Sequence, residues 1–153
     1  MGNIFNPDFV DFIRCLNKWQ VQYVLVGGYA VILHGYPRTT GDMDIWVNPA
    51  KENYQKILKT FSDFGLSVFD MTEENFLNTK KYDVFKFGIS PVRIDLMTEV
   101  KSLDFNDTFS KAVWMEIDED VKAKTIHINQ LIQTKKASNR PKDIDDLNNL
   151  KSE

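Results

Sequence analysis

Two aspartates that lie two residues apart are the strongest chemical signal in this sequence. Asp42 and Asp44 belong to the stretch RTTGDMDIWV at positions 38–47. Side chains alternate along a β-strand, so an extended backbone places both carboxylates on the same face. Neighbouring carboxylates repel each other unless a cation lies between them, and Mg²⁺ prefers such oxygen ligands. The pattern favours a divalent-metal site over the alternative, an exposed aspartate pair near a strand edge.

A third aspartate, Asp95, lies in the largely apolar stretch VRIDLM at positions 92–97. Its neighbours Ile94 and Leu96 face the opposite side of an extended strand. A carboxylate in a buried strand is unfavourable unless it is paired with a cation or bound to a metal. From this stretch alone, a salt bridge and a metal site both remain open for Asp95.

A pair of glycines, Gly27 and Gly28, follows the apolar stretch YVLV at positions 23–26. Glycines at a strand–helix junction permit a sharp turn and let a ligand approach the backbone closely. The free N–H groups at the start of the next helix suit a phosphate group. The segment matches neither of the common glycine-rich nucleotide-binding loops. A tight structural turn explains these two residues equally well.

Basic side chains accompany the acidic ones. Arg38 precedes the aspartate pair, and Lys135 and Arg140 lie near the C-terminal end of the sequence. Such cations either stabilise phosphate charge or pair with carboxylates. For Lys135 and Arg140 the competing partners are the nearby aspartates at positions 143, 145 and 146.

These motifs together resemble the polymerase-β-like nucleotidyltransferase superfamily, in which a glycine pair, a short spacer, Asp-x-Asp and a distant strand aspartate follow in this order. The sequence is most similar to the minimal branch, which includes the abortive-infection (AbiEii-type) toxins and small antibiotic nucleotidyltransferases. The residues that carry this closer resemblance are GGYA at 27–30, HG at 34–35, R-x-T-x-D-x-D at 38–44 and K-x-A-x-x-R-P-K-D-x-x-D-L at 135–147. One departure is Tyr29, where many active members have serine.

The resemblance implies transfer of a nucleoside monophosphate from a nucleoside triphosphate to a hydroxyl acceptor, with release of pyrophosphate. It implies two Mg²⁺ ions, or Mn²⁺ in their place, with Asp42 and Asp44 on the nucleotide's ion and Asp95 at the second position. It gives Lys135 a catalytic role. The nucleotide-binding residues that it implies are Gly27, Gly28, Arg38, Thr40 and Arg140. The acceptor stays open among a small molecule, a tRNA end and a protein hydroxyl, and a homodimer is allowed.

Two other functions compete with this interpretation. The first is a catalytically weak nucleotide-binding module or toxin–antitoxin component, for which Tyr29 leaves room. The second is a glycosyltransferase that uses Asp42 and Asp44 as its metal motif. Catalytic domains of that kind are generally much larger than 153 residues, so the second function is disfavoured.

The elements that must position these residues alternate between helix and strand. Helices are expected from position 7, at 29–34, from 49 to 65, at 73–77, and in a C-terminal pair at about 129–151. Strands are expected at 22–26, 43–47 and 66–69, at 84–89 and 92–98 joined across Ser90-Pro91, and in a hairpin at 113–117 and 121–128. Positions 104–111 are ambiguous. This order predicts an α/β (α+β) nucleotidyltransferase fold, with a short mixed central sheet and flanking helices.

The composition fits one globular domain over positions 1–153. Hydrophobic residues make up 42% and charged residues 27%, with a net charge of −3. This mild acidity argues against broad nonspecific nucleic-acid binding, which needs a basic surface. No apolar run is long enough to cross a bilayer, and the single cysteine, Cys15, excludes an intrachain disulfide. We therefore expect a cytoplasmic protein that does not contact a membrane.

Overall fold

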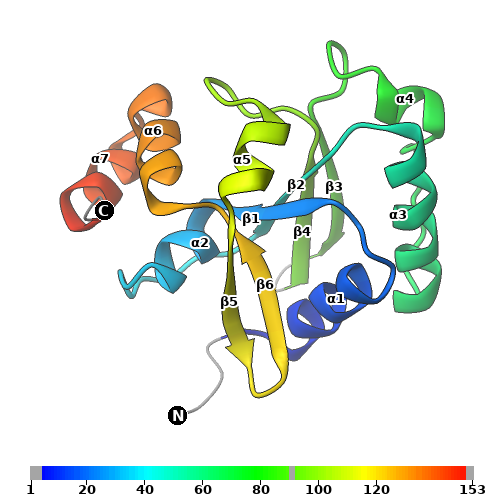
Figure 1. Cartoon of the computed structure of the whole chain (residues 1–153), viewed down its shortest axis with the longest axis horizontal. Helices are drawn as coiled ribbons and strands as arrows, with labels where there is room; N and C mark the ends of the chain where they lie inside the picture. The colour runs from blue at the N-terminus through cyan, green and yellow to red at the C-terminus, as the bar shows by residue number, and fades with distance from the viewer. Residues whose placement is uncertain (1–4, 90–91, 151–153) are drawn as a thin grey trace.

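The computed structural model of the protein describes residues 5–89 and 92–150. Figure 1 shows its helices and strands. In chain order they are α1 (Pro7–Lys18), β1 (Tyr23–Val26), α2 (Gly27–Leu33), β2 (Met43–Val47), α3 (Lys51–Phe64), α4 (Glu73–Leu77), β3 (Val84–Ile89), β4 (Val92–Met97), α5 (Phe105–Lys111), β5 (Val113–Asp118), β6 (Val121–Thr125), α6 (Ile128–Ser138) and α7 (Pro141–Asn149).

The six strands form one mixed sheet in the order β3-β4-β2-β1-β6-β5. Strand β2 lies near its centre, antiparallel to β1 and parallel to β4. The outer pairs β3/β4 and β5/β6 are antiparallel, and β1 runs parallel to β6. The predicted α/β class with a short mixed sheet is therefore confirmed.

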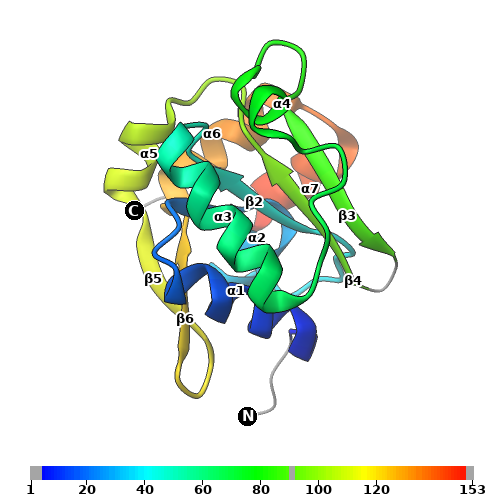
Figure 2. The same ribbon diagram turned by 90° about the vertical axis from the view of Figure 1, so that its right-hand side faces the viewer.

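Alternation along β2 divides the sheet into two faces. Met43, Ile45 and Val47 are buried in the hydrophobic core beneath α1 and α3, which lie side by side over this face in Figure 2. Trp46 belongs to a second cluster on the other face, where its ring meets Phe105 of α5 edge-on. Because Asp44 shares the Trp46 side of the strand, its carboxylate points away from the main core.

The boundaries correct several expectations. The predicted strand at 66–69 does not form, because Gly65 ends α3 in the left-handed region and the following backbone closes local turns. Phe69 itself has a φ of 49° and a side chain that is 71% exposed. Strand β6 ends at Thr125, and His127 is the N-cap of α6 rather than a strand residue.

Other expectations agree with the structure or lie outside it. The ambiguous segment 104–111 contains helix α5, whose first turn is capped by the side chain of Asp104. The C-terminal pair of helices is present as α6 and α7. The turn predicted at Ser90-Pro91 lies outside the described residues. Within those residues, no helix has the length and apolar character needed to span a bilayer.

Candidate active site

Strand pairing brings the three predicted carboxylates to one region. Asp44 is the partner of Asp95 in the parallel β2/β4 register and of Val26 in the antiparallel β1/β2 register. Asp42 immediately precedes β2. A polar cavity of about 390 Å³ lies beside them. All nine predicted site residues line it, namely Gly27, Gly28, Arg38, Thr40, Asp42, Asp44, Asp95, Lys135 and Arg140, together with Gly41, Lys86 and Lys142.

The carboxylates form an unbalanced cluster of negative charge. The pKa of Asp44 is raised to about 6, first by burial and then by the charges of Asp95 and Asp42, against the opposing charges of Lys142 and Lys135. A carboxyl pKa this far above its usual value of 3.8 means that the ionised form is disfavoured in the folded protein. An added cation would relieve this repulsion.

Two cations lie beside the cluster, but both contacts are long. Lys86 Nζ is 3.6 Å from Asp95 Oδ2, and Arg93 Nε is 3.6 Å from Asp42 Oδ1. The Lys86 side chain is 60% exposed, so solvent screens this pair strongly. The other carboxylate oxygen of Asp95 is buried and has no hydrogen-bond partner. The lysine therefore compensates Asp95 only in part.

The two glycines are required by close contacts. Gly27 has a φ of +70°, and a Cβ placed on it would collide with Asp44 Oδ2. A Cβ on Gly28 would collide with Thr40 Oγ1 and would lie 3.1 Å from a terminal guanidinium nitrogen of Arg38. The glycine pair thus lets the start of α2 approach the acidic cluster and the segment after α2 without intervening side-chain atoms.

Three cations that line the cavity belong to a network of paired charges, which we call the α6–α7 charge network. It consists of Arg38, Lys135, Arg140, Asp143 and Asp146. Lys135 Nζ lies 3.3 Å from Asp143 Oδ1 and 3.1 Å from Asp146 Oδ2. Arg140 Nε lies 2.8 Å from Asp143 Oδ2, and Arg38 Nε lies 2.8 Å from Asp146 Oδ1. The two aspartates and Lys135 are buried.

This network has the opposite electrostatic character to the acidic cluster. Burial works to raise the pKa of Asp143, but hydrogen bonds from Arg140 and the charge of Lys135 outweigh it and lower that pKa. Hydrogen bonding to Asp143 raises the pKa of Arg140. The sequence left open whether Lys135 and Arg140 face phosphate or pair with aspartates. In the structure both residues line the cavity and both are paired.

Tyr29, the departure from the family pattern, does not line this cavity. Its ring stacks on Phe5 at a centroid distance of 4.8 Å and meets Phe9 edge-on at 5.4 Å. Tyr29 therefore packs α2 against α1 in the core. His34 follows α2 as its C-cap, and its Nε2 hydrogen-bonds the carbonyl oxygen of Ile126 at 2.7 Å.

Sequence reasoning missed Lys86 and Lys142 as cavity residues. Lys142 belongs to the C-terminal motif at 135–147, so the motif could have been used to predict it as a cavity residue. Lys86 is different, because only the antiparallel register of β3 and β4 places it opposite Asp95. No motif in the sequence marks that pairing.

The donor set suits a hard cation, although the carboxylates are not gathered into a finished metal site. Within residues 5–89 and 92–150, no group of three or more His, Cys, Asp or Glu side chains is arranged so that it could hold a metal ion. The unpartnered oxygen of Asp95 and the raised pKa of Asp44 nevertheless fit an oxygen-preferring cation. Metal binding by Asp42, Asp44 and Asp95 stays a prediction.

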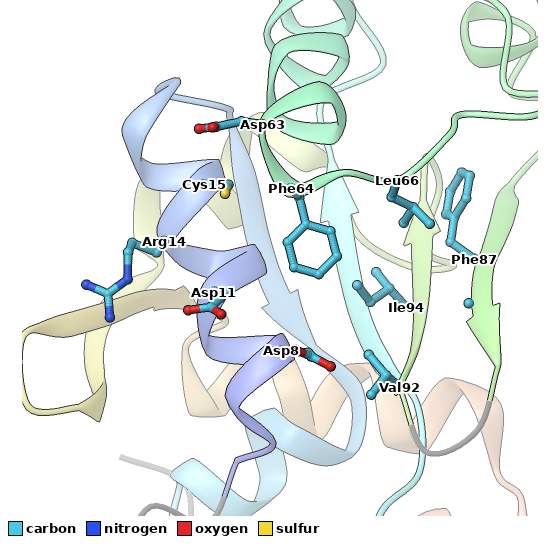
Figure 3. Close-up of a pocket in the computed structure, with 11 residues that line it drawn as sticks. Asp8, Asp11, Arg14, Cys15, Asp63, Phe64, Leu66, Phe87, Val92 and Ile94 are labelled. Atoms are coloured by element: carbon cyan, nitrogen blue, oxygen red, sulfur yellow. The ribbon is translucent and has the colours of Figure 1, made fainter.

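A second cavity, of about 470 Å³, lies on the other side of the sheet (Figure 3). Side chains from α1, the end of α3 and strands β3 and β4 surround it, and they include Phe64, Phe87 and Ile94. Asp8, Asp11 and the free Cys15 lie along its α1 side. Burial raises the pKa of the Cys15 thiol. None of the predicted site residues lines this cavity.

A protein-family model described as "Nucleotidyltransferase of unknown function (DUF6036)" matches residues 10–151. The chain belongs to this nucleotidyltransferase family. The motif order read from the sequence and the family match therefore agree, and the protein is a transferase of this kind. Among curated proteins, no sequence matches the chain.

Solved structures with a similar fold are also nucleotidyltransferases. One is TM1012 from Thermotoga maritima, described as a candidate nucleotidyltransferase, with a TM-score of 0.62 and 16% identity over 96% of this chain and 94% of that one. Another is the lincosamide antibiotic adenylyltransferase LnuA in its lincomycin-bound form, with a TM-score of 0.58 and 16% identity over 99% of both chains. At these identities the similarity establishes the fold, which is that of the nucleotidyltransferases.

Proposed function

We propose that this transferase moves a nucleoside monophosphate from a nucleoside triphosphate to a hydroxyl acceptor in a Mg²⁺-dependent reaction. The observation that carries the proposal is the cavity itself. One side of it is a strained cluster of carboxylates, the other side is a wall of cations, and a glycine pair opens the backbone between them. A metal–triphosphate complex has the charge distribution that such a cavity complements.

The acidic side would hold the metal. Asp42, Asp44 and Asp95 supply the oxygen ligands, and bound Mg²⁺ would contribute Lewis-acid stabilisation of phosphoryl oxygens. The residues of the chain provide the rest. Gly27 and Gly28 would present backbone to the phosphates, and their lack of a Cβ, which would collide with Asp44 or Thr40, supports this role.

The basic side would stabilise the leaving pyrophosphate. Lys135, Arg140 and Lys142 line the wall opposite the carboxylates. Cations that are held in place before the reaction stabilise charge as it develops, without a further cost of reorganisation. Arg38 and Thr40 lie against Gly28 and would complete the phosphate contacts on the same side.

A small hydroxylated molecule is the first acceptor class to test, because LnuA is described as an adenylyltransferase of a lincosamide antibiotic. A tRNA end and a protein hydroxyl are the other two classes. The three classes are separated by supplying each with a radiolabelled nucleotide and finding which one becomes labelled.

The function itself is tested by pyrophosphate release from each of ATP, GTP, CTP and UTP with Mg²⁺ or Mn²⁺ and a pool of acceptors. The expected result is release with at least one nucleotide, its loss with EDTA, and its loss in Asp42→Asn. Lys136→Ala is the control, because Lys136 is exposed and lies outside the cavity. Nucleotide binding without release under every condition would identify a binding module and contradict the proposal.

A further inference from the structure

The carboxylate of Asp146 joins two segments that are far apart in the sequence. It contacts the guanidinium of Arg38, on the segment after α2, with Nε at 2.8 Å from Oδ1 and Nη2 at 3.2 Å from Oδ2. It also contacts the ammonium of Lys135 on α6, at 3.1 Å. Arg38 and Lys135 both line the cavity, whereas Asp146 is 1% exposed and does not.

We propose that Asp146 is a positioning residue for nucleotide binding: it holds Arg38 and Lys135 on one wall of the cavity before the triphosphate arrives. This inference rests on the function proposed above and adds a residue to it that touches no substrate. Arginine and lysine side chains are long and lose much conformational freedom when a ligand fixes them. A ligand that meets them already fixed binds more tightly, because that loss has occurred during folding.

Burial makes the arrangement dependent on Asp146. Lys135 is only 5% exposed, and an ammonium in such a place is unfavourable unless carboxylates surround it. Arg38, Lys135 and Arg140 are paired with two aspartates, Asp143 and Asp146, so three positive charges face two negative charges. The network therefore retains an excess positive charge toward a phosphate while its side chains are held.

Asp143 has a more local role, which distinguishes it from Asp146. Its carboxylate accepts a hydrogen bond from the backbone N–H of Arg140 at 3.1 Å and so caps the start of α7. Asp146 ties the helix pair to Arg38 itself, 108 positions away in the sequence. The neighbouring Asp145 instead accepts a hydrogen bond from the Tyr36 hydroxyl at 2.6 Å on the same segment. Loss of Asp146 should affect ligand affinity through Arg38, whereas loss of Asp143 should first affect the helix.

The test uses Asp146→Asn, which keeps the shape of the side chain and removes its charge. The probes are inorganic tripolyphosphate, titrated by calorimetry, and ATP, for which KM and kcat are measured by pyrophosphate release. Looser cations predict that tripolyphosphate affinity falls and the KM for ATP rises by ~10-fold, with a smaller fall in kcat through Lys135. If Asp146 only neutralises charge, the variant wall is more positive and affinity rises, which overturns the inference.

A double-mutant cycle with Arg38→Gln shows whether Asp146 acts through Arg38. The expected result is that Asp146→Asn weakens tripolyphosphate binding less in the Arg38→Gln background than in the wild-type background, since Lys135 is then the remaining cation for Asp146 to position. Additive losses would overturn this route. Asp63→Asn is the matched control, because it breaks an exposed pair with Lys18 far from the cavity and should leave both constants unchanged.

Two further outcomes are decisive. If Asp146→Asn does not fold, Asp146→Glu keeps the charge and moves the carboxylate by one methylene. Lower affinity for tripolyphosphate with a smaller change in kcat supports the inference, and wild-type affinity overturns it. If the wild-type protein binds neither tripolyphosphate nor any of the four nucleoside triphosphates, the proposed function fails and this inference fails with it. Wild-type binding with an unchanged Asp146→Asn overturns the inference alone.

Discussion

The two walls of the cavity contain the same kinds of charged side chain in opposite arrangements. On the α6–α7 wall, each buried aspartate has a cation within about 3 Å, and the pKa of Asp143 is lowered. On the strand wall, Asp44 lies beside two other aspartates, and its pKa is raised to about 6. Both walls are partly buried, so burial alone does not explain the difference. The number and distance of the cations do.

The difference in compensation by nearby cations separates two kinds of charged residue. One kind stabilises the fold, and the other stays uncompensated until a ligand binds. Asp143 contributes to folding because its lowered pKa means that its ionised form is favoured in the native state. Asp44 opposes folding at neutral pH, since burial and the neighbouring carboxylates that raise its pKa are absent in the unfolded chain. A protein retains such repulsion where a bound cation relieves it. We therefore propose that Asp42, Asp44 and Asp95 serve chiefly in metal binding and catalysis. The α6–α7 charge network serves chiefly to stabilise the fold.

The largest expected effect is a loss of turnover when the acidic cluster of Asp42, Asp44 and Asp95 is changed. Asp42→Asn should reduce pyrophosphate release by about 10³-fold, because a neutral amide is a poor ligand for the metal that stabilises the reacting phosphate. The fold should persist, and without metal the melting temperature should stay level or rise. Activity assays and thermal melts on the same preparation check this. A large fall in melting temperature with full activity would identify Asp42 as a structural partner of Arg93 instead.

The next largest expected effect is a loss of stability when the α6–α7 charge network is changed. Lys135→Ala leaves two buried aspartates short of one cation, and breaking buried pairs in this way reduces the free energy of unfolding by about 3 kcal/mol. Turnover should fall as well, because Lys135 lines the cavity. Lys136→Ala, one position along the helix and exposed, should change neither quantity. Denaturant unfolding of both variants measures the contrast, and equal stability of the two would contradict it.

A smaller effect links stability to pH in metal-free buffer. The pKa of Asp44 is about 6 in the folded protein against 3.8 for an unperturbed carboxyl, so the folded state binds the proton more tightly. Stability from this group is present below pH 4 and is lost as the pH rises through 6. Because the side chain is only partly buried, the loss should be about 1–3 kcal/mol.

The matching variant is Asp44→Asn, which removes the titration. It should be more stable than wild type at pH 8 and closest to it at pH 4. Chemical unfolding at both pH values, with EDTA present, gives the two differences. A variant that is less stable than wild type at pH 8 would show that the Asp44 charge is compensated in the native state.

The smallest effect concerns the long contact between Lys86 and Asp95. Lys86→Met removes a cation that competes with the metal for the Asp95 carboxylate. The affinity for Mn²⁺ should therefore rise a few-fold, because the free energy of a long, exposed ion pair is small. Calorimetric titration with Mn²⁺ measures this. Lys80→Met, at another exposed lysine, should leave the affinity unchanged. Weaker Mn²⁺ binding in Lys86→Met alone would mean that Lys86 orients Asp95 for the metal.

The sequence alone determined the local parts of this protein. The stretch at 42–47 predicted the strand Met43–Val47 and a shared face for Asp42 and Asp44, because side-chain alternation depends only on neighbouring residues. The start of the first helix at position 7, the glycine pair and the family motifs could be recognised for the same reason. The strand expected at 66–69 failed, since a β-strand needs a partner and the apolar residues there found none in the sheet.

The tertiary structure decided everything that depends on which segments lie side by side. Register pairs Asp44 with Asp95, and it places Lys86 opposite Asp95, across sequence distances that no local pattern encodes. The packing of α7 decides that Asp146 joins Arg38 to Lys135, which the sequence showed only as nearby charges near the C-terminus. The reason is physical: whether a buried charge is compensated depends on distances of a few ångströms in space, and those distances exist only after the chain has folded.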